Sequence, residues 1–209
     1  MFTLIKREIE DHLAYFIGAI ILSAVLTALL ASALFYDEPT DRPVFVGLSI
    51  PAIVVLTIGF ASMGVSQMYT DRNRKISTFL TGLPVTRCQI LTARIITGIL
   101  AILIVLVPMI ITGTILWRLF TPPIPIYLGL IFDLSVTVFL MGFACYCLGL
   151  QTGWTSSRIT PTLGGLVLTC IIVPLFIVKG FGPYIKVILV LFIVASLIRI
   201  WQKFKTTAL

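Results

Sequence analysis

YTDRNRKISTFLTGLPVTRCQ, residues 69–89, is the only long polar interruption in an otherwise strongly apolar chain. It holds four basic residues against a single acid, Asp71. The basic residues are Arg72, Arg74, Lys75 and Arg87. Long apolar runs flank the stretch on both sides, so it separates two predicted membrane-spanning helices. A chain this apolar has few other places at which to meet a soluble partner.

The composition predicts an all-α integral membrane protein. The chain has 209 residues, of which 59% are hydrophobic and 11% charged, and its mean hydropathy is +1.13. Soluble domains average roughly 45–50% apolar and about 25% charged residues. Runs of about 20 apolar residues can cross a bilayer core of roughly 30 Å. Residues 1–209 are therefore expected to form a single transmembrane domain, with the lipid bilayer as its surroundings.

Run lengths and turn residues predict six transmembrane helices. They cover residues 13–35, 44–68, 90–117, 126–150, 162–178 and 184–200. With both ends inside, eleven of the fifteen Lys and Arg residues fall on the inner side. These are Lys6, Arg7, Arg72, Arg74, Lys75, Arg87, Arg94, Arg158, Arg199, Lys203 and Lys205. The positive-inside rule then predicts a multi-pass protein of the cell (inner, cytoplasmic) membrane with both termini cytoplasmic. The net charge of +7 is read as this topology signal, and no nucleic acid is expected as a partner.

The polar stretch itself predicts a short amphipathic helix. Its apolar residues are spaced at i, i+3, i+4 and i+7, which places them on one helical face. They are Ile76, Phe79, Leu80 and Leu83. Gly82 can end the helix, and Pro84 stops it from continuing. Such a helix at the cytoplasmic surface could dock a partner, or its cations could hold anionic lipid head groups.

The start of the third span is predicted by a capping box. Thr86 and Gln89 have the T-x-x-Q spacing, in which each side chain satisfies a free backbone N–H group. Val85 and Ile90 supply the matching hydrophobic staple. The chain is therefore expected to leave the surface helix and re-enter the membrane at a fixed angle.

The run from Asp71 to Arg94 resembles the first cytoplasmic loop of ABC-2-type transporter permeases. That pattern is roughly an acidic-basic pair, then LxSLPVSR, then an apolar pair followed by Ala-Lys or Ala-Arg. Leu83-Pro84-Val85-Thr86-Arg87 matches the LPVSR core with Thr for Ser. Gly82 departs from the usual Ser, and Arg94 stands where Lys is commoner. Leu4-Ile5-Lys6-Arg7-Glu8 also resembles the start of that family, and elsewhere the likeness rests on length, span number and topology.

In that family the loop carries a coupling helix, which docks into a groove on a cytoplasmic ATPase. The resemblance implies these docking residues: Arg72, Arg74, Lys75, Ile76, Phe79, Leu80, Leu83, Pro84 and Arg87. The N-terminal stretch resembles the amphipathic elbow helix of the family, here with Ile5, Lys6, Arg7 and Ile9. Ile5, Ile9, Leu13 and Phe16 are expected to share one helical stripe. The alternative is a straight extension of the first span into solvent.

Nucleotide chemistry is expected on another chain. The sequence contains no G-x-x-x-x-G-K-[ST] motif, so ATP and Mg²⁺ would be bound by a partner ABC ATPase and this chain would bind no cofactor. The resemblance also implies a second permease copy or a sister permease. An enzyme is not expected, because the only histidine, His12, is predicted to lie on a surface helix, and triads and zinc motifs require more.

Asp133 is the one acid predicted within a span. Acids at membrane depth are costly, and they usually face a protein interior or a wet cavity. Asp133 is therefore a candidate for the translocation path or its gate. It could instead be a structural ion-pair partner of Arg118, Lys179 or Lys186. The four cysteines are expected to be reduced packing residues.

Three functions remain open at this point. The first is the permease subunit of an ATP-driven ABC-2-type exporter. The second is a six-span substrate-capture subunit of a vitamin importer, whose class contacts its partner through small residues such as Ala24, Ala28 and Ala31. The third is a membrane-embedded enzyme, which lacks a convergent set of acid and base residues.

Overall fold

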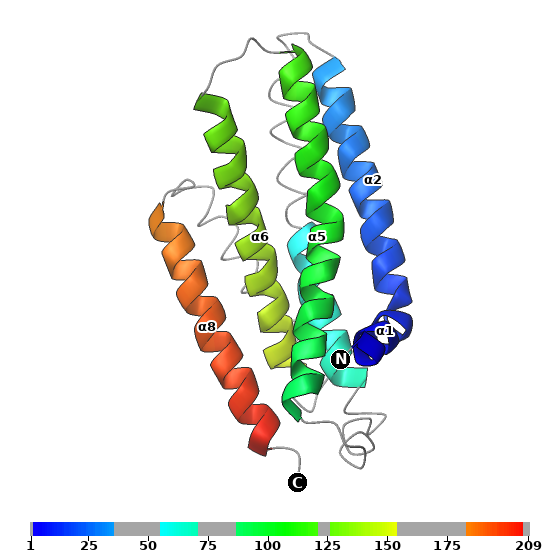
Figure 1. Cartoon of the computed structure of the whole chain (residues 1–209), viewed down its shortest axis with the longest axis vertical. Helices are drawn as coiled ribbons and strands as arrows, with labels where there is room; N and C mark the ends of the chain where they lie inside the picture. Colours follow the sequence, from blue (N-terminus) through cyan, green and yellow to red (C-terminus); the bar gives the residue numbers. More distant parts are fainter. Residues whose placement is uncertain (1, 36–54, 71–86, 121–125, 154–182, 207–209) are drawn as a thin grey trace.

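The computed structural model describes residues 2–35, 55–70, 87–120, 126–153 and 183–206. The labelled helices are α1 (Phe2–Asp11), α2 (Leu13–Phe35), α5 (Arg87–Phe120), α6 (Ile126–Thr152) and α8 (Pro183–Thr206). Residues 55–70 form a further helix, which we call segment 55–70 and which is cyan in Figure 1. Every regular element within these ranges is helical, as the composition predicts.

Three of these helices are long and apolar enough to cross a membrane. The qualifying windows are Cys88–Ile115, Phe132–Thr152 and Pro183–Lys203. A bent pair, Ile5–Asp11 with Leu13–Ala28, would make a fourth span if it were counted as one. The helical membrane class is thus supported. The predicted span at 162–178 and the first part of the one at 44–68 lie outside the described residues.

The helix bounds follow the sequence prediction closely. α2 begins and ends at the predicted residues, and α6 begins at the predicted Ile126. α5 and α8 run past the predicted spans, because a helix can continue into water where its apolar run stops. With 34 residues, α5 is about 50 Å long, and it continues through Pro108. Pro183 opens α8, in the position where its missing N–H group costs nothing.

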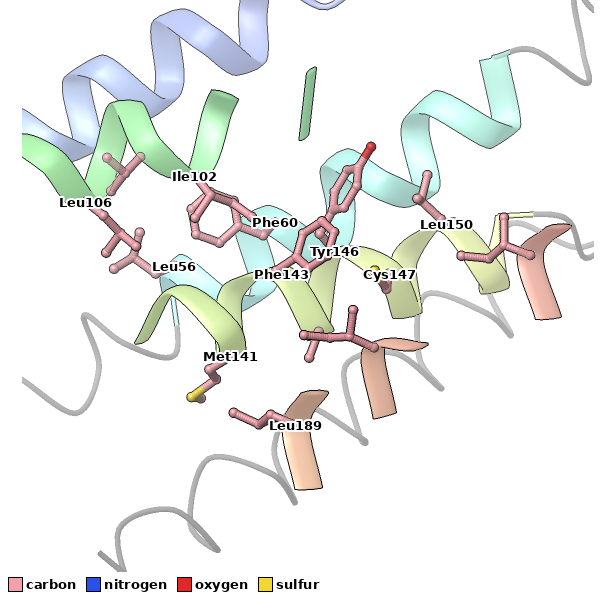
Figure 2. Close-up of a cluster of buried hydrophobic side chains, with 14 of the residues drawn as sticks. Leu56, Phe60, Ile102, Leu106, Met141, Phe143, Tyr146, Cys147, Leu150 and Leu189 are labelled. Atoms are coloured by element: carbon pink, nitrogen blue, oxygen red, sulfur yellow. The ribbon is translucent and has the colours of Figure 1, made fainter. Parts of the chain in front are cut away.

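α5 is the central helix of the described bundle. It packs against α1, α2 and α6, and α6 in turn packs against α8 (Figure 1). The core between them is apolar. In Figure 2, Phe60 of segment 55–70, Ile102 of α5 and Phe143 of α6 gather on one side of α6, and Met141 and Leu189 lie toward α8. The outer sides of α2 and α8 expose Ile, Val and Leu side chains, as expected for surfaces solvated by lipid.

Glycines bring segment 55–70 and α6 into close contact. A Cβ atom added at Gly64 would lie 2.5 Å from the Tyr146 carbonyl oxygen and 2.9 Å from the Leu150 nitrogen. One added at Gly153 would lie 2.7 Å from the Met68 Cβ atom. Gly149 faces the Ala61 carbonyl in the same way. Small residues allow helix backbones to approach closely within membranes, and here they fix the place where Tyr146 meets its neighbours.

Candidate functional site at the Arg94 junction

The predicted docking loop lies between two packed helices. Segment 55–70 ends at Thr70, and α5 begins at Arg87, at the end of the bundle where α1 also lies (Figure 1). Arg87 directly follows Thr86, so the start of α5 agrees with the predicted capping box. The other predicted docking residues lie outside the described residues. They are Arg72, Arg74, Lys75, Ile76, Phe79, Leu80, Leu83 and Pro84.

The N-terminal amphipathic helix is present as a separate element. α1 is bent by 76° relative to α2, so it is not a straight extension of the first span. Its cations pair with its own acids, one turn further along the helix. Lys6 Nζ lies 4.0 Å from Glu10 Oε1, and Arg7 Nε lies 3.7 Å from Asp11 Oδ2. With two cations against the three acids Glu8, Glu10 and Asp11, the side chains of α1 offer no excess positive charge to anionic lipids.

The predicted apolar stripe is broken at the bend. Ile9 packs against a small core cluster that includes the buried Phe16, and Ile5 is half-buried. Leu13, expected on the same stripe, is instead 54% exposed. The bend at His12 interrupts the helical register and turns Leu13 outward, while Ile9 and Phe16 still pack in the same cluster.

His12 is buried, although it directly follows the surface helix α1. Only 5% of the residue is exposed. Its backbone N–H group donates to the Glu8 carbonyl oxygen at 3.2 Å, and its own carbonyl oxygen accepts from the Tyr15 N–H group at 2.9 Å. The imidazole Nε2 lies 3.8 Å from Glu8 Oε2. Its position at the bend turns the side chain inward rather than toward solvent.

Glu8 and Arg94 form an ion pair that joins α1 to α5. Arg94 Nε donates to Glu8 Oε1 at 3.3 Å, and the two residues are 86 positions apart in sequence. The Arg94 side chain is 2% exposed and the Glu8 side chain 18%. Arg94 Nη1 also lies 3.5 Å from the Met68 sulfur, on segment 55–70. One side chain therefore contacts two other helices.

The backbone of Arg94 contacts a fourth element. The Tyr146 hydroxyl, on α6, donates to the Arg94 carbonyl oxygen at 2.8 Å and lies 2.6 Å from Gln67 Oε1. The Tyr146 ring lies directly against Gly98, where any side chain would collide with it. Residues of α1, segment 55–70 and α6 thus meet at Arg94 of α5, and we call this group of Glu8, Gln67, Met68, Arg94 and Tyr146 the Arg94 junction.

The orientation of the Gln67 amide completes the junction. A phenol carries one proton, so Tyr146 can donate fully to only one of the two carbonyl oxygens. Gln67 Nε2 is buried, with no hydrogen-bond partner among the described residues. Turning the amide by 180° makes Nε2 a donor to the Tyr146 oxygen and leaves the phenol proton for the Arg94 carbonyl. Tyr146 then relays one hydrogen bond from segment 55–70 to α5.

The charges at the junction are one cation and one anion. Burial lowers the pKa of His12, and the positive charge of Arg94 lowers it further, against the opposing effects of Glu8 and Asp11. His12 is consequently neutral near pH 7. Glu8 is then left as the acid that faces Arg94.

Asp133 forms an ion pair with one of its three predicted partners. Lys186 Nζ, on α8, lies 2.6 Å from Asp133 Oδ1. The Asp133 side chain is 58% exposed and that of Lys186 is 22% exposed. Both stand near the first residues of their apolar windows. This contact matches the structural-pair interpretation, while a role in a translocation path stays a prediction.

The sequence contained two signals for the junction. Arg94 is a charge set within an apolar run, and such a residue is costly unless it is paired. Gly149 and Gly153 form a G-x-x-x-G pair, which marks close helix packing. The pairing of Arg94 with Glu8 could not be read from the sequence, because it depends on the bend at His12. Among the described residues, no three or more His, Cys, Asp or Glu side chains are grouped to hold a metal ion, and Cys145 and Cys147 are buried.

Comparison with protein-family models, with curated proteins and with solved structures finds no match for this chain. Its function is therefore inferred from the loop sequence and from the geometry of the helices that flank the loop.

Proposed function

We propose that this chain is the membrane-spanning permease subunit of an ATP-driven ABC-2-type exporter. The observation that carries the proposal is the Leu83-Pro84-Val85-Thr86-Arg87 motif, placed directly before a long apolar helix. ATP and Mg²⁺ would be bound by a separate ATPase subunit, and two permease subunits would work together. The transported compound would pass between those two subunits.

The flanking helices support a coupling role for the loop. Segment 55–70 and α5 contact each other near their loop-proximal ends through Met68 and Arg94. A partner bound to the loop would therefore act on both helices at one place. The tight glycine contacts between segment 55–70 and α6 would carry the displacement into the rest of the bundle. Closing two ATPases against each other could move the helices in this way.

Site-specific crosslinking can test the docking residues. A photo-crosslinking amino acid at Phe79 in the full chain should capture an ABC ATPase in the native membrane, identified by mass spectrometry. Phe79→Asp should abolish co-purification of that ATPase, because it places a charge on the apolar face of the predicted helix. Thr78→Asp adds the same charge to another face and is the matched control, for which co-purification should persist.

Two outcomes would overturn the proposal. One is a Phe79→Asp variant that keeps both its ATPase and its transport activity. The other is nanomolar binding of a small vitamin by the isolated chain, which would favour the substrate-capture alternative. One observation favours that alternative: Ala24 and Ala28, the small residues through which this class would contact its partner, are exposed on α2.

A further inference from the structure

α1 differs from the other described helices in how it is held. Its described side chains run from Ile5 to Asp11, and none of them is buried. By contrast, the residue that it meets on α5, Arg94, is 2% exposed. Ile9 packs against the small core cluster of Phe16, Met63 and Ala101, and the ion pair of Glu8 with Arg94 adds a buried polar contact between α1 and α5.

The partner side of this contact is rigid. The Arg94 carbonyl is fixed by Tyr146, and the side chain lies against Met68. Tyr146 is itself seated on Gly98 and fully buried. Arg94 therefore belongs to the packed core formed by segment 55–70, α5 and α6. Glu8, by contrast, belongs to α1, a separate helix that is bent by 76° from α2 at His12.

We propose that α1 is a strap, latched to α5 by the Glu8–Arg94 ion pair. A displacement of α5 relative to α2 at this end of the bundle is transmitted to α1, or it opens the latch and frees α1 to swing at His12. The position of α1 therefore depends on the positions of segment 55–70 and α5, the two helices that flank residues 71–86. This inference does not depend on what the loop binds.

Among the described residues, further titratable groups lie near the latch. Asp11 and His12 follow Glu8 on its own side of the contact, and the Tyr146 hydroxyl approaches the Arg94 backbone from α6. His12 Nε2 lies 3.8 Å from the second carboxylate oxygen of Glu8. Burial lowers the pKa of His12, so the imidazole is neutral near pH 7. Arg94 is then the charged partner of Glu8 in this contact.

Hydrogen–deuterium exchange of the full chain in lipid nanodiscs tests the latch. Glu8→Gln should raise the exchange rates of the α1 amides at least about tenfold, with the α8 amides unchanged. Glu10→Gln is the matched control, because Glu10 is 66% exposed on the same helix and pairs only loosely with Lys6. For this variant, the α1 rates should stay within about twofold of the wild type.

A second background shows whether Glu8 acts through Arg94. In an Arg94→Met chain, adding Glu8→Gln should change the α1 rates by less than about twofold, since the latch is already absent. An equal effect of Glu8→Gln in both backgrounds would assign its role to His12 and overturn the proposal. Faster exchange spread equally over α1 and α8 would also overturn it, because Glu8 would then support the whole bundle.

Discussion

Two inter-helix ion pairs among the described residues each join a basic and an acidic side chain, but in opposite surroundings. Lys186 and Asp133 join α8 to α6 at 2.6 Å, with the aspartate 58% exposed. Glu8 and Arg94 join α1 to α5 at a longer 3.3 Å, with the arginine 2% exposed. Judged by distance alone, the Lys186–Asp133 pair would be the stronger interaction. Burial reverses the ranking, because a buried charge without its partner cannot be solvated.

The difference explains what each pair can do in the fold. An exposed ion pair adds little stability, because its two charges remain solvated when they separate. A buried pair also contributes little as a whole, because burying both charges is costly. Removing one member is what is costly. The Glu8–Arg94 pair is therefore expected to hold α1 against α5 more strongly than the Asp133–Lys186 pair holds α8 against α6.

The largest expected effect is that of Glu8→Gln. It should lower the free energy of α1 opening by at least about 1.4 kcal/mol, equivalent to tenfold faster exchange, because it removes the negative charge 3.3 Å from the buried Arg94 side chain. Asp133→Asn should lower the free energy of α8 opening by less than about 1 kcal/mol. Hydrogen–deuterium exchange of the α1 and α8 amides gives both values. Similar losses for the two variants would remove the contrast between buried and exposed pairs.

A smaller effect is expected from Gly64→Ala. The added methyl group would approach backbone atoms of Tyr146 and Leu150, which cannot move without separating the helices. A loss of about 1–3 kcal/mol is expected. Gly59→Ala is the matched control on the same segment, since it has nothing within 4 Å of its added Cβ atom. That change should be neutral, or stabilising by about 0.5–1 kcal/mol through its helix preference.

Tyr146→Phe should cost about 1 kcal/mol, the typical net value of a hydrogen bond. It removes the hydroxyl that links Gln67 with the Arg94 carbonyl, while keeping the ring on Gly98. Adding Gln67→Leu should recover part of the loss, because the orphaned amide is removed as well. If the double variant is less stable than Tyr146→Phe alone, Gln67 has another role.

The smallest effect is the pH dependence from His12. Burial lowers the pKa of His12 in the folded chain, so the unfolded chain takes up a proton first on acidification. Stability should be complete above the unfolded pKa of about 6.5 and fall as the pH drops below it. Thermal unfolding measured from pH 7.5 to 5.5 should show this decrease, and His12→Gln should flatten it. An unchanged slope in His12→Gln would mean that other groups cause the pH dependence.

Helix positions were predictable from sequence because they depend on local signals. The bounds of α2 and the start of α6 follow from apolar runs and flanking turn residues, and the start of α5 follows from the capping box. The site was less predictable. Arg94 was predicted only as an inner cation, and its partner depends on the 76° bend at His12, which the apolar stripe did not reveal.

Asp133 shows a complementary limit of sequence reasoning. An acid within an apolar stretch suggests a buried or functional group. Its position near the start of the apolar window, with Lys186 opposite on α8, allows it an exposed pairing instead. The depth of a charge depends on how neighbouring helices are staggered, and that stagger is set by tertiary packing.

The coupling energy between Glu8 and Arg94 tests the central claim most directly. A double-mutant cycle with Glu8→Gln and Arg94→Met, measured by hydrogen–deuterium exchange of the helix that the pair holds, here α1, isolates this interaction. The buried latch predicts a coupling of at least about 2 kcal/mol, against less than about 1 kcal/mol for the same cycle on Asp133 and Lys186. A Glu8–Arg94 coupling no larger than that of the exposed pair would contradict the claim that this contact holds α1.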